Sequence, residues 1–218
     1  MGVSGFSRWA ALARRLFPIR VRVQARVRIA GHARSDLPPV DPKEFRRLMG
    51  LFATGVTVVT AATDEGVHGM TANAVMSVSL DPLLVCVSVD RRARLNRFLD
   101  ASGGFAINVL AEGQRALSQF FAGVWQGPPP EYQVETWVGG PRLLGCLASI
   151  GCAVDTVLDG GDHRLFVGRV LSVHRGDGQL SPLLFFGGRY HRLPEPERAP
   201  RDPVEVWRPE EVQIFYGE

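Results

Sequence analysis

The 218-residue sequence lacks a long hydrophobic run and the short motifs of several large enzyme classes. No stretch approaches the roughly eighteen consecutive apolar residues of a membrane-spanning helix, so we expect no membrane span. No GxGxxG lies between a strand and a helix, so the sequence does not indicate a nicotinamide site on a parallel sheet. The P-loop, HExxH and GxSxG motifs are also absent, which leaves the chemistries that depend on them without support.

Cysteine and histidine are sparse. The three cysteines, Cys86, Cys146 and Cys152, form no CxxC pair, and two of them fall in expected strands. We therefore interpret all three as small core residues of a cytoplasmic protein that lives under reducing conditions. The five histidines are scattered without metal-ligand spacing, so we expect no metal site.

A net positive charge is missing from most of the chain, although the formal net charge of the whole is +3. Residues 1–40 hold eight arginines and one acidic residue, Asp36, which gives +7 and leaves 3 − 7 = −4 for residues 41–218. A nucleic-acid-binding protein carries its basic stripe on the folded body, so we predict no nucleic-acid function. Residues 1–40 are predicted to be an Arg-rich, flexible extension. A basic arm for a membrane surface or an acidic partner is the alternative.

What the sequence does contain is a succession of short segments that alternate with a period of two. These segments predict strands at about 55–63, 67–80, 83–89, 104–111, 147–158, 163–175 and 183–193. Short helices are expected at about 92–101 and 112–121. Many strands with few helices between them favour a mainly β, antiparallel barrel with short covering helices over βαβ units. We place this domain at residues 41–193 and a tail at 194–218.

A first helix is predicted at the start of the domain, within residues 41–52. Its apolar residues are spaced i, i+3, i+4, i+7, which predicts one buried stripe made of Phe45, Leu48, Met49 and Phe52.

The segment 68–82 reads as a strand, yet it is rich in small and polar residues. Small side chains let a flat aromatic ligand approach the backbone, and the Asn73 amide offers both a donor and an acceptor to a pyrimidine-like edge. An ordinary strand with a polar solvent face is the alternative.

A strand end and a helix start meet at residues 88–98, where Ser88, Arg91, Arg92, Arg94 and Asn96 gather. A helix N-terminus with arginine and serine beside it suits a phosphate group. A solvated basic helix face is the alternative.

Two further places could hold a ligand. His163 follows a tight turn at a strand start, where it could contact a nicotinamide or a flavin edge or remain exposed to water. Gly187 and Gly188 interrupt a strand just before Arg189 and Tyr190. The tyrosine could stack on a ligand ring and the arginine could pair with a phosphate. A bulged edge strand is the alternative.

Five segments in this order resemble the flavin reductase-like family, whose members include reductase components of two-component flavin-dependent monooxygenases. They are FATGVTVVTA (52–61), GMTANAVMSVSLDPLLVCVSV (69–89), GGFAINVLAEGQ (103–114), GDHRLFVGRVL (161–171) and PLLFFGGRY (182–190). The resemblance implies a Greek-key split barrel that binds FMN or FAD, usually as a homodimer with the site near the subunit interface.

The resemblance also implies positions for the site. Those expected to line the flavin ring are Gly69, Met70, Thr71, Asn73 and Ala74. Those expected to hold the ribityl chain and phosphate are Val87, Ser88, Val89, Ala93 and Arg94. Those expected to close over the flavin are Gln119 and Phe120, and those expected to meet the nicotinamide are His163 and Tyr190.

The implied activity is hydride transfer from NADH or NADPH to FMN or FAD, with His163 as the catalytic candidate. The implied partner is a flavin-dependent oxygenase that receives the reduced flavin. Two alternatives stay open. One is a flavin-binding protein without reductase activity, and the other is a flavin-retaining oxidase or oxygenase that acts on an organic substrate.

Overall fold

The computed structural model describes residues 38–64 and 66–194, so the predictions for residues 1–37 and for the tail lie outside the described residues. The helices are α2 (Pro42–Met49), α3 (Leu95–Ser102), the 3-10 turn η1 (Glu112–Gln114) and α4 (Arg115–Phe121). The strands are β1 (Thr54–Gly55), β2 (Thr57–Thr63), β3 (Gly66–Ala72), β4 (Val75–Leu80), β5 (Leu83–Asp90), β6 (Gly104–Val109), β7 (Val134–Glu135), β8 (Arg142–Leu143), β9 (Ala148–Gly160), β10 (His163–Arg175), β11 (Leu184–Phe186) and β12 (Arg189–His191).

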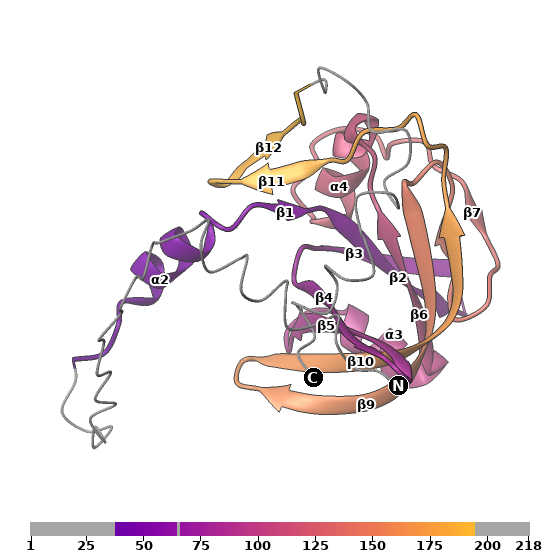
Figure 1. The fold of residues 1–218 in the computed structure, drawn as a ribbon, viewed down its shortest axis with the longest axis horizontal. Helices are drawn as coiled ribbons and strands as arrows, with labels where there is room; N and C mark the ends of the chain where they lie inside the picture. Colours follow the sequence, from indigo (N-terminus) through magenta and orange to yellow (C-terminus); the bar gives the residue numbers. More distant parts are fainter. Residues whose placement is uncertain (1–37, 65, 195–218) are drawn as a thin grey trace, which may run out of the picture. The chain divides into compact units, whose positions relative to one another are not determined.

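An antiparallel seven-stranded sheet in the order β3-β2-β6-β9-β10-β5-β4 forms the body of the domain (Figure 1). Its edge strands β3 and β4 are separated in the chain only by Asn73 and Ala74. Consecutive Cα atoms lie about 3.8 Å apart, so Ala72 and Val75 are within about 11 Å of each other. The sheet must therefore curl until its edges meet, and the prediction of a mainly β, antiparallel split barrel is confirmed.

The single strand expected at 67–80 is wrong, because the structure divides it at Asn73 and Ala74. Before this point β3 pairs with β2, and after it β4 pairs with β5. The Ser88 N–H donates a hydrogen bond to the Ala74 carbonyl at 3.0 Å, which places the junction directly over β5. A continuous period of two cannot reveal this change of partner, because the alternation runs on through the bend.

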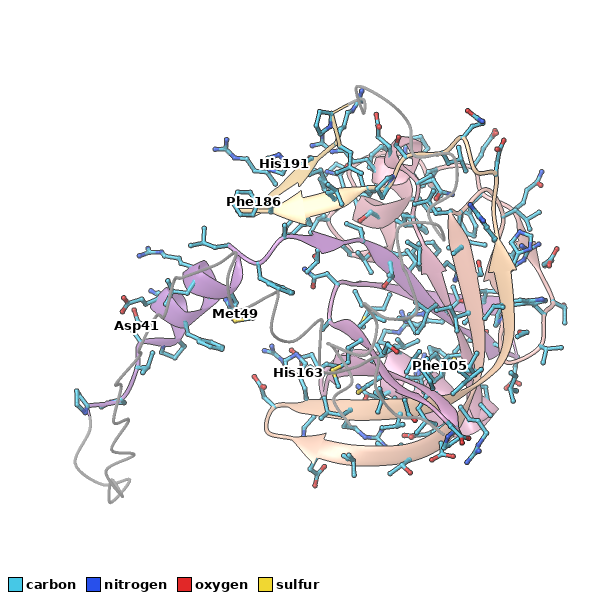
Figure 2. All side chains as sticks on the ribbon, in the orientation of Figure 1. Asp41, Met49, Phe105, His163, Phe186 and His191 are labelled. Carbon is cyan, nitrogen blue, oxygen red and sulfur yellow. The ribbon has the colours of Figure 1, made fainter. Side chains whose placement is uncertain are left out.

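The main hydrophobic core lies inside the barrel and includes Phe105, Phe166 and Val87, each fully buried. Figure 2 shows Phe105 among the strands of the barrel. Free cysteines are buried in the core regions, as predicted, and burial raises the pKa of Cys146 to about 11 and that of Cys152 to about 12. These thiols are filling space rather than performing chemistry.

Helices α3 and α4 cover the barrel close to the ranges predicted for them. Leu95 and Leu99 of α3 are buried in the main core, and Leu117 of α4 belongs to a second buried cluster that also contains Leu183 and Leu110. In Figure 1, α4 lies next to the β11–β12 hairpin. The two helices therefore shield separate regions of the sheet.

The long connection after α4 contains mostly irregular chain, and a buried polar network fastens its end to the barrel. The fully buried Asn108 amide donates to the Val58 carbonyl and to the Thr60 hydroxyl, both at 3.0 Å. Its oxygen accepts from the Leu143 N–H at 3.0 Å and from the Ser149 hydroxyl at 3.1 Å. Four hydrogen bonds satisfy this side chain, so its burial is compensated.

The buried stripe predicted for residues 41–52 is wrong. Helix α2 forms where expected, but none of its residues is buried, and Phe45, Leu48, Met49 and Phe52 are each more than half exposed. Lys43, Arg46 and Arg47 of this helix line a cavity instead. Apolar spacing identified the helix and its apolar side correctly, but not the surface that this side would meet.

Candidate active site

Three adjoining cavities meet at Asn73, the residue at which β3 gives way to β4. The strand cavity, about 400 Å³, is lined by Met49, Phe52, Thr54, Asn73, Ala74, Val75, Met76, Cys86, Ser88 and Leu165. The outer cavity, about 780 Å³, is lined by Lys43, Arg46, Arg47, Met49, Gly50, Leu51, Phe52, Asn73, Phe185, Gly187 and Gly188. The inner cavity, about 190 Å³, is lined by Val56, Thr71, Ala72, Asn73, Ser118, Ala122, Phe185 and Tyr190.

The strand cavity is produced by the alternation of β5. Val85, Val87 and Val89 point into the main core, while Cys86 and Ser88 point to the opposite face and line the cavity. Leu165 of β10 pairs with Ser88 and completes this wall. The result is a mainly apolar slot with a few polar groups at defined positions, the usual composition of a small-molecule site.

One polar group in the strand cavity has no partner. The Thr54 hydroxyl oxygen is buried and makes no hydrogen bond within the described residues. Leaving such a group unpaired costs about 1–3 kcal/mol. The Asn73 amide at the same cavity offers both a donor and an acceptor to the edge of a flat ring.

The inner cavity is framed by a chain of hydroxyl groups. The Ser118 and Tyr190 hydroxyls lie 3.0 Å apart, and the Thr71 hydroxyl donates to the Ser118 carbonyl at 2.6 Å. The Arg115 guanidinium lies over the Tyr190 ring at 5.1 Å from its centroid. Strand β3, helix α4 and strand β12 are thereby locked together, so Tyr190 has a defined orientation.

At the junction of β5 and α3, two of the three arginines are engaged by carboxylates. Arg91 contacts Asp159 and donates to the Gly161 carbonyl at 2.9 Å. Arg92 forms a salt bridge to Asp90 at 2.7 Å, and hydrogen bonds from Arg92 hold the pKa of that carboxyl well below its usual range. Arg94 forms no such ion pair within the described residues and is exposed, which leaves it free for an anionic ligand.

Strand alternation orients His163 toward the strand cavity. It begins β10 two residues before Leu165, so both side chains project from the same face of the sheet, about 7 Å apart along the strand. Figure 2 shows it next to the turn of the β9–β10 hairpin. Its Nδ1 contacts the Asp162 carboxylate at 2.7 Å, and this hydrogen bond lowers the pKa of Asp162. The contact fixes the ring and leaves Nε2 for a ligand.

The cavities bring together five of the fourteen residues expected to contact the cofactors: Thr71, Asn73, Ala74, Ser88 and Tyr190. The others lie around them. Val87 and Val89 are buried core residues and can offer only backbone groups to a ligand, and Ala93 packs against the same core. Those that line none of the three cavities are Gly69, Met70, Val87, Val89, Ala93, Arg94, Gln119, Phe120 and His163.

Two of the predicted residues have packing roles in the structure. A Cβ on Gly69 would lie 2.6 Å from the Phe121 ring, so glycine is required here for α4 to approach β3. Phe120 makes ring contacts with Phe121 and Tyr132, at centroid distances of 5.1 and 6.1 Å. Their roles toward a flavin stay predictions.

Several cavity residues were missed by sequence reasoning. Leu165 could have been found, because it shares a strand face with His163. Ser118 gave no signal, since a serine inside a short amphipathic helix is ordinary. Thr54 and Cys86 also gave none, because the cavity they line exists only after β1, β5 and β10 are assembled.

No group of three or more potential metal-ligating side chains occurs within residues 38–64 and 66–194. No helix in those ranges is long and apolar enough to cross a membrane. The cavities thus offer apolar walls, hydroxyls, an amide and nearby arginines. Such a site can hold and orient a ring-bearing phosphorylated ligand.

The fold and these cavities define a mainly β, antiparallel split barrel with a candidate small-molecule site at the β3–β4 junction. Residues 49–194 match the family described as "Flavin reductase like domain". The chain belongs to the flavin reductase-like family.

Individual relatives agree over most of their lengths. An NADH-dependent flavin reductase from Rhodococcus is 42% identical over 160 residues, which cover 72% of this chain and 89% of the relative. The reductase component of a 4-hydroxyphenylacetate 3-monooxygenase from Thermus thermophilus is 41% identical, with 68% and 95% covered. The solved structure of flavin reductase PheA2 superposes with a TM-score of 0.68 at 44% identity, covering 72% of this chain and all of that one.

Proposed function

We propose that the protein is an NADH-dependent flavin reductase that passes a hydride from the reduced nicotinamide to a flavin held in the strand cavity. The observation that carries this proposal is the cavity itself, a mainly apolar slot at the β3–β4 junction with the Asn73 amide on its wall. Family membership and relatives named as NADH-dependent flavin reductases support the nicotinamide as donor.

The cofactors supply the redox chemistry, in which hydride moves from the nicotinamide to the flavin. The protein supplies position. Ala74 and Ser88 keep the slot narrow and let a flat ring reach the backbone, and Asn73 orients its polar edge. Holding two reactants in the correct relative orientation can lower an activation barrier by several kcal/mol, so no nucleophile or strong acid is required.

Polar groups around the slot are assigned to the flavin phosphate and to the nicotinamide. Ser88 and Arg94 would hold the flavin phosphate, because Arg94 is the junction arginine without a carboxylate partner among the described residues. His163 and Tyr190 would orient the nicotinamide. Gly69, Met70 and Thr71 would flank the ring, while Gln119 and Phe120 would close over it.

The reduced flavin is proposed to serve an oxygenase component, because the Thermus thermophilus relative is the reductase component of a monooxygenase. We also retain residues 41–193 as the catalytic domain, flanked by residues 1–40 and 194–218. The free, buried cysteines support a cytoplasmic location.

We propose further that the protein is a homodimer. Phe45 and Leu48 on α2, with Met76 and Leu80 on β4, are 57–60% exposed. Monomers seldom expose such groups together beside an open site. A second copy would cover this apolar surface and enclose the strand cavity. The double variant Phe45→Glu/Leu48→Glu should sediment as a monomer, and a wild-type protein that is monomeric at micromolar concentration would overturn this assignment.

The function is tested by NADH oxidation with and without added FMN or FAD, together with a flavin titration. Wild-type protein should oxidise NADH only when flavin is present. Asn73→Ala should weaken flavin binding by roughly tenfold, because it removes a hydrogen bond inside an apolar slot. Tight flavin binding without NADH oxidation would instead identify a flavin-binding protein or a flavin-retaining oxidase.

A further inference from the structure

Helix α2 turns a basic face toward the outer cavity. Lys43, Arg46, Arg47 and Gly50 are spaced i, i+3, i+4, i+7, so they share one side of the helix, and all four line the cavity. Phe45 and Leu48 do not line it. Lys43, Arg46 and Arg47 therefore face the outer cavity together with Met49, while Phe45 and Leu48 point away from it.

This concentration of positive charge is local. Residues 41–218 together carry a formal charge of −4, whereas the cavity wall on α2 contains three cationic side chains and no acidic residue. Within residues 38–64 and 66–194, neither Arg46 nor Arg47 has an ion-pair partner. When cationic side chains line a cavity that no carboxylate lines, the cavity attracts an anionic ligand.

A glycine turn next to the end of α2 also lines the outer cavity and leaves room for a ligand to approach its backbone. Gly187 and Gly188 connect β11 to β12 in a two-residue turn with φ of +58° and +76°, values that favour glycine. A Cβ on either glycine would meet nothing within 4 Å, so the turn presents bare backbone to open space. The Gly187 N–H donates to the Gly50 carbonyl at 2.8 Å, which ties this turn to the end of α2.

The floor between these walls is apolar and includes Phe52 and Phe185. The outer cavity also shares Asn73, Met49 and Phe52 with the strand cavity, so the two spaces are continuous. A molecule whose redox ring lies in the strand cavity can therefore extend into a space that has an apolar floor and a cationic wall. A volume of about 780 Å³ lies within the ordinary range for a ligand site.

We propose that the outer cavity binds the adenosine diphosphate half of a dinucleotide whose redox ring occupies the neighbouring strand cavity. Arg46 and Arg47 contact the diphosphate, and the adenine lies on the apolar floor near the glycine turn. This inference rests on the proposed function, and it assigns a binding role to α2 that is separate from any role in dimerisation. NADH and FAD both contain the required half. If FAD supplies it, its diphosphate lies at Arg46 and Arg47 and the assignment of the flavin phosphate to Ser88 and Arg94 is wrong, so the two sources must be separated by experiment.

The test uses the full-length double variant Arg46→Gln/Arg47→Gln and truncated ligands that lack the adenosine half. The matched control is Arg169→Gln/Arg175→Gln, which removes the same charge from β10, outside the three cavities. Dissociation constants for FAD, FMN and ADP are measured by fluorescence or calorimetric titration. KM values are measured for NADH and for reduced nicotinamide mononucleotide.

If the outer cavity holds the adenosine half of the nicotinamide, the double variant raises KM for NADH roughly tenfold and leaves the mononucleotide unchanged. If it holds that half of the flavin, the variant raises the FAD dissociation constant by a similar factor and leaves FMN unchanged. In either case ADP binding weakens, and the control variant behaves as wild type.

Equal losses for full and truncated ligands, or no loss for any ligand, would overturn the proposal. A wild-type protein that binds flavin but does not oxidise NADH would defeat the proposed function instead. In that event the FAD, FMN and ADP titrations still decide whether the cavity recognises a diphosphate.

Discussion

The buried Asn108 network permits a quantitative prediction about stability. In Asn108→Asp, one carboxyl oxygen can still accept from the Leu143 N–H and the Ser149 hydroxyl. The other replaces an NH2 group that donates to the Val58 carbonyl and the Thr60 hydroxyl. Two hydrogen bonds are lost and a carboxylate is placed against a carbonyl oxygen in the fully buried interior.

The expected cost at neutral pH is about 3–5 kcal/mol, the range for a buried charge left without a compensating partner. For a domain of this size that corresponds to a fall in Tm of about 10 °C or more. Leucine at the same position has a similar volume but leaves the Leu143 N–H without its acceptor. Asn108→Leu should therefore cost about 2–3 kcal/mol.

The two variants differ in pH dependence. Burial raises the pKa of the introduced carboxyl above the value of about 3.9 that it has in the unfolded chain. The protonated carboxyl can donate to Val58 again, so the stability deficit of Asn108→Asp is smallest below that unfolded pKa and grows as the pH rises toward the folded pKa. The deficit of Asn108→Leu should not change with pH.

The assay is urea unfolding of wild type and both variants at about pH 5 and about pH 8, away from extreme acid. The difference from wild type is the quantity of interest, because groups common to all three proteins cancel. A deficit below about 1 kcal/mol for Asn108→Asp, or one that is equal at both pH values, would refute the reasoning.

Three further outcomes follow from the described contacts. Ser118→Ala and Tyr190→Phe should each lower kcat/KM for NADH by roughly twofold to tenfold. The double variant should be no worse than either single variant, because both substitutions remove the same 3.0 Å hydroxyl contact. Additive losses in a double-mutant cycle would contradict this. FMN should slow the labelling of Cys86 by a thiol reagent, followed by mass spectrometry, since Cys86 lines the strand cavity; unchanged labelling would place the flavin elsewhere. Burial, together with the charges of Arg94 and Arg97, lowers the pKa of His68. Wild type should therefore lose stability as the pH falls through the unfolded-chain value of about 6.5, and His68→Gln should lose less. Equal falls in the Tm of the two proteins would contradict this reasoning.

Much of the fold was accessible from the sequence because the physical signal is local. The period-two alternation of β5 and β10 reports which residues share a face, and it identified both strands closely. Helices α3 and α4 were found within a few residues, from grouped apolar side chains. Cys86 and Cys152 were correctly interpreted as core residues because they lie in alternating apolar segments.

Other features depend on partners that are distant in the chain. The division between β3 and β4 arises because β3 pairs with β2 and β4 with β5, a choice that alternation cannot encode. The apolar residues of α2 were predicted to be buried and are exposed. Amphipathic spacing shows that a helix has an apolar side but does not show what covers that side. Ser118 entered the candidate site only through its contact with Tyr190, which lies 72 residues later.

The most direct test of the central claim is anaerobic reduction of the flavin by NADH with a catalytic amount of the protein. Without oxygen, the flavin and nicotinamide absorbances can be followed together. The account predicts that both disappear in equal amounts, rapidly with wild-type protein and slowly without it, and that Asn73→Ala needs more flavin to reach the same rate. Flavin that stays oxidised in the presence of wild-type protein and excess NADH would contradict the assignment of a flavin reductase.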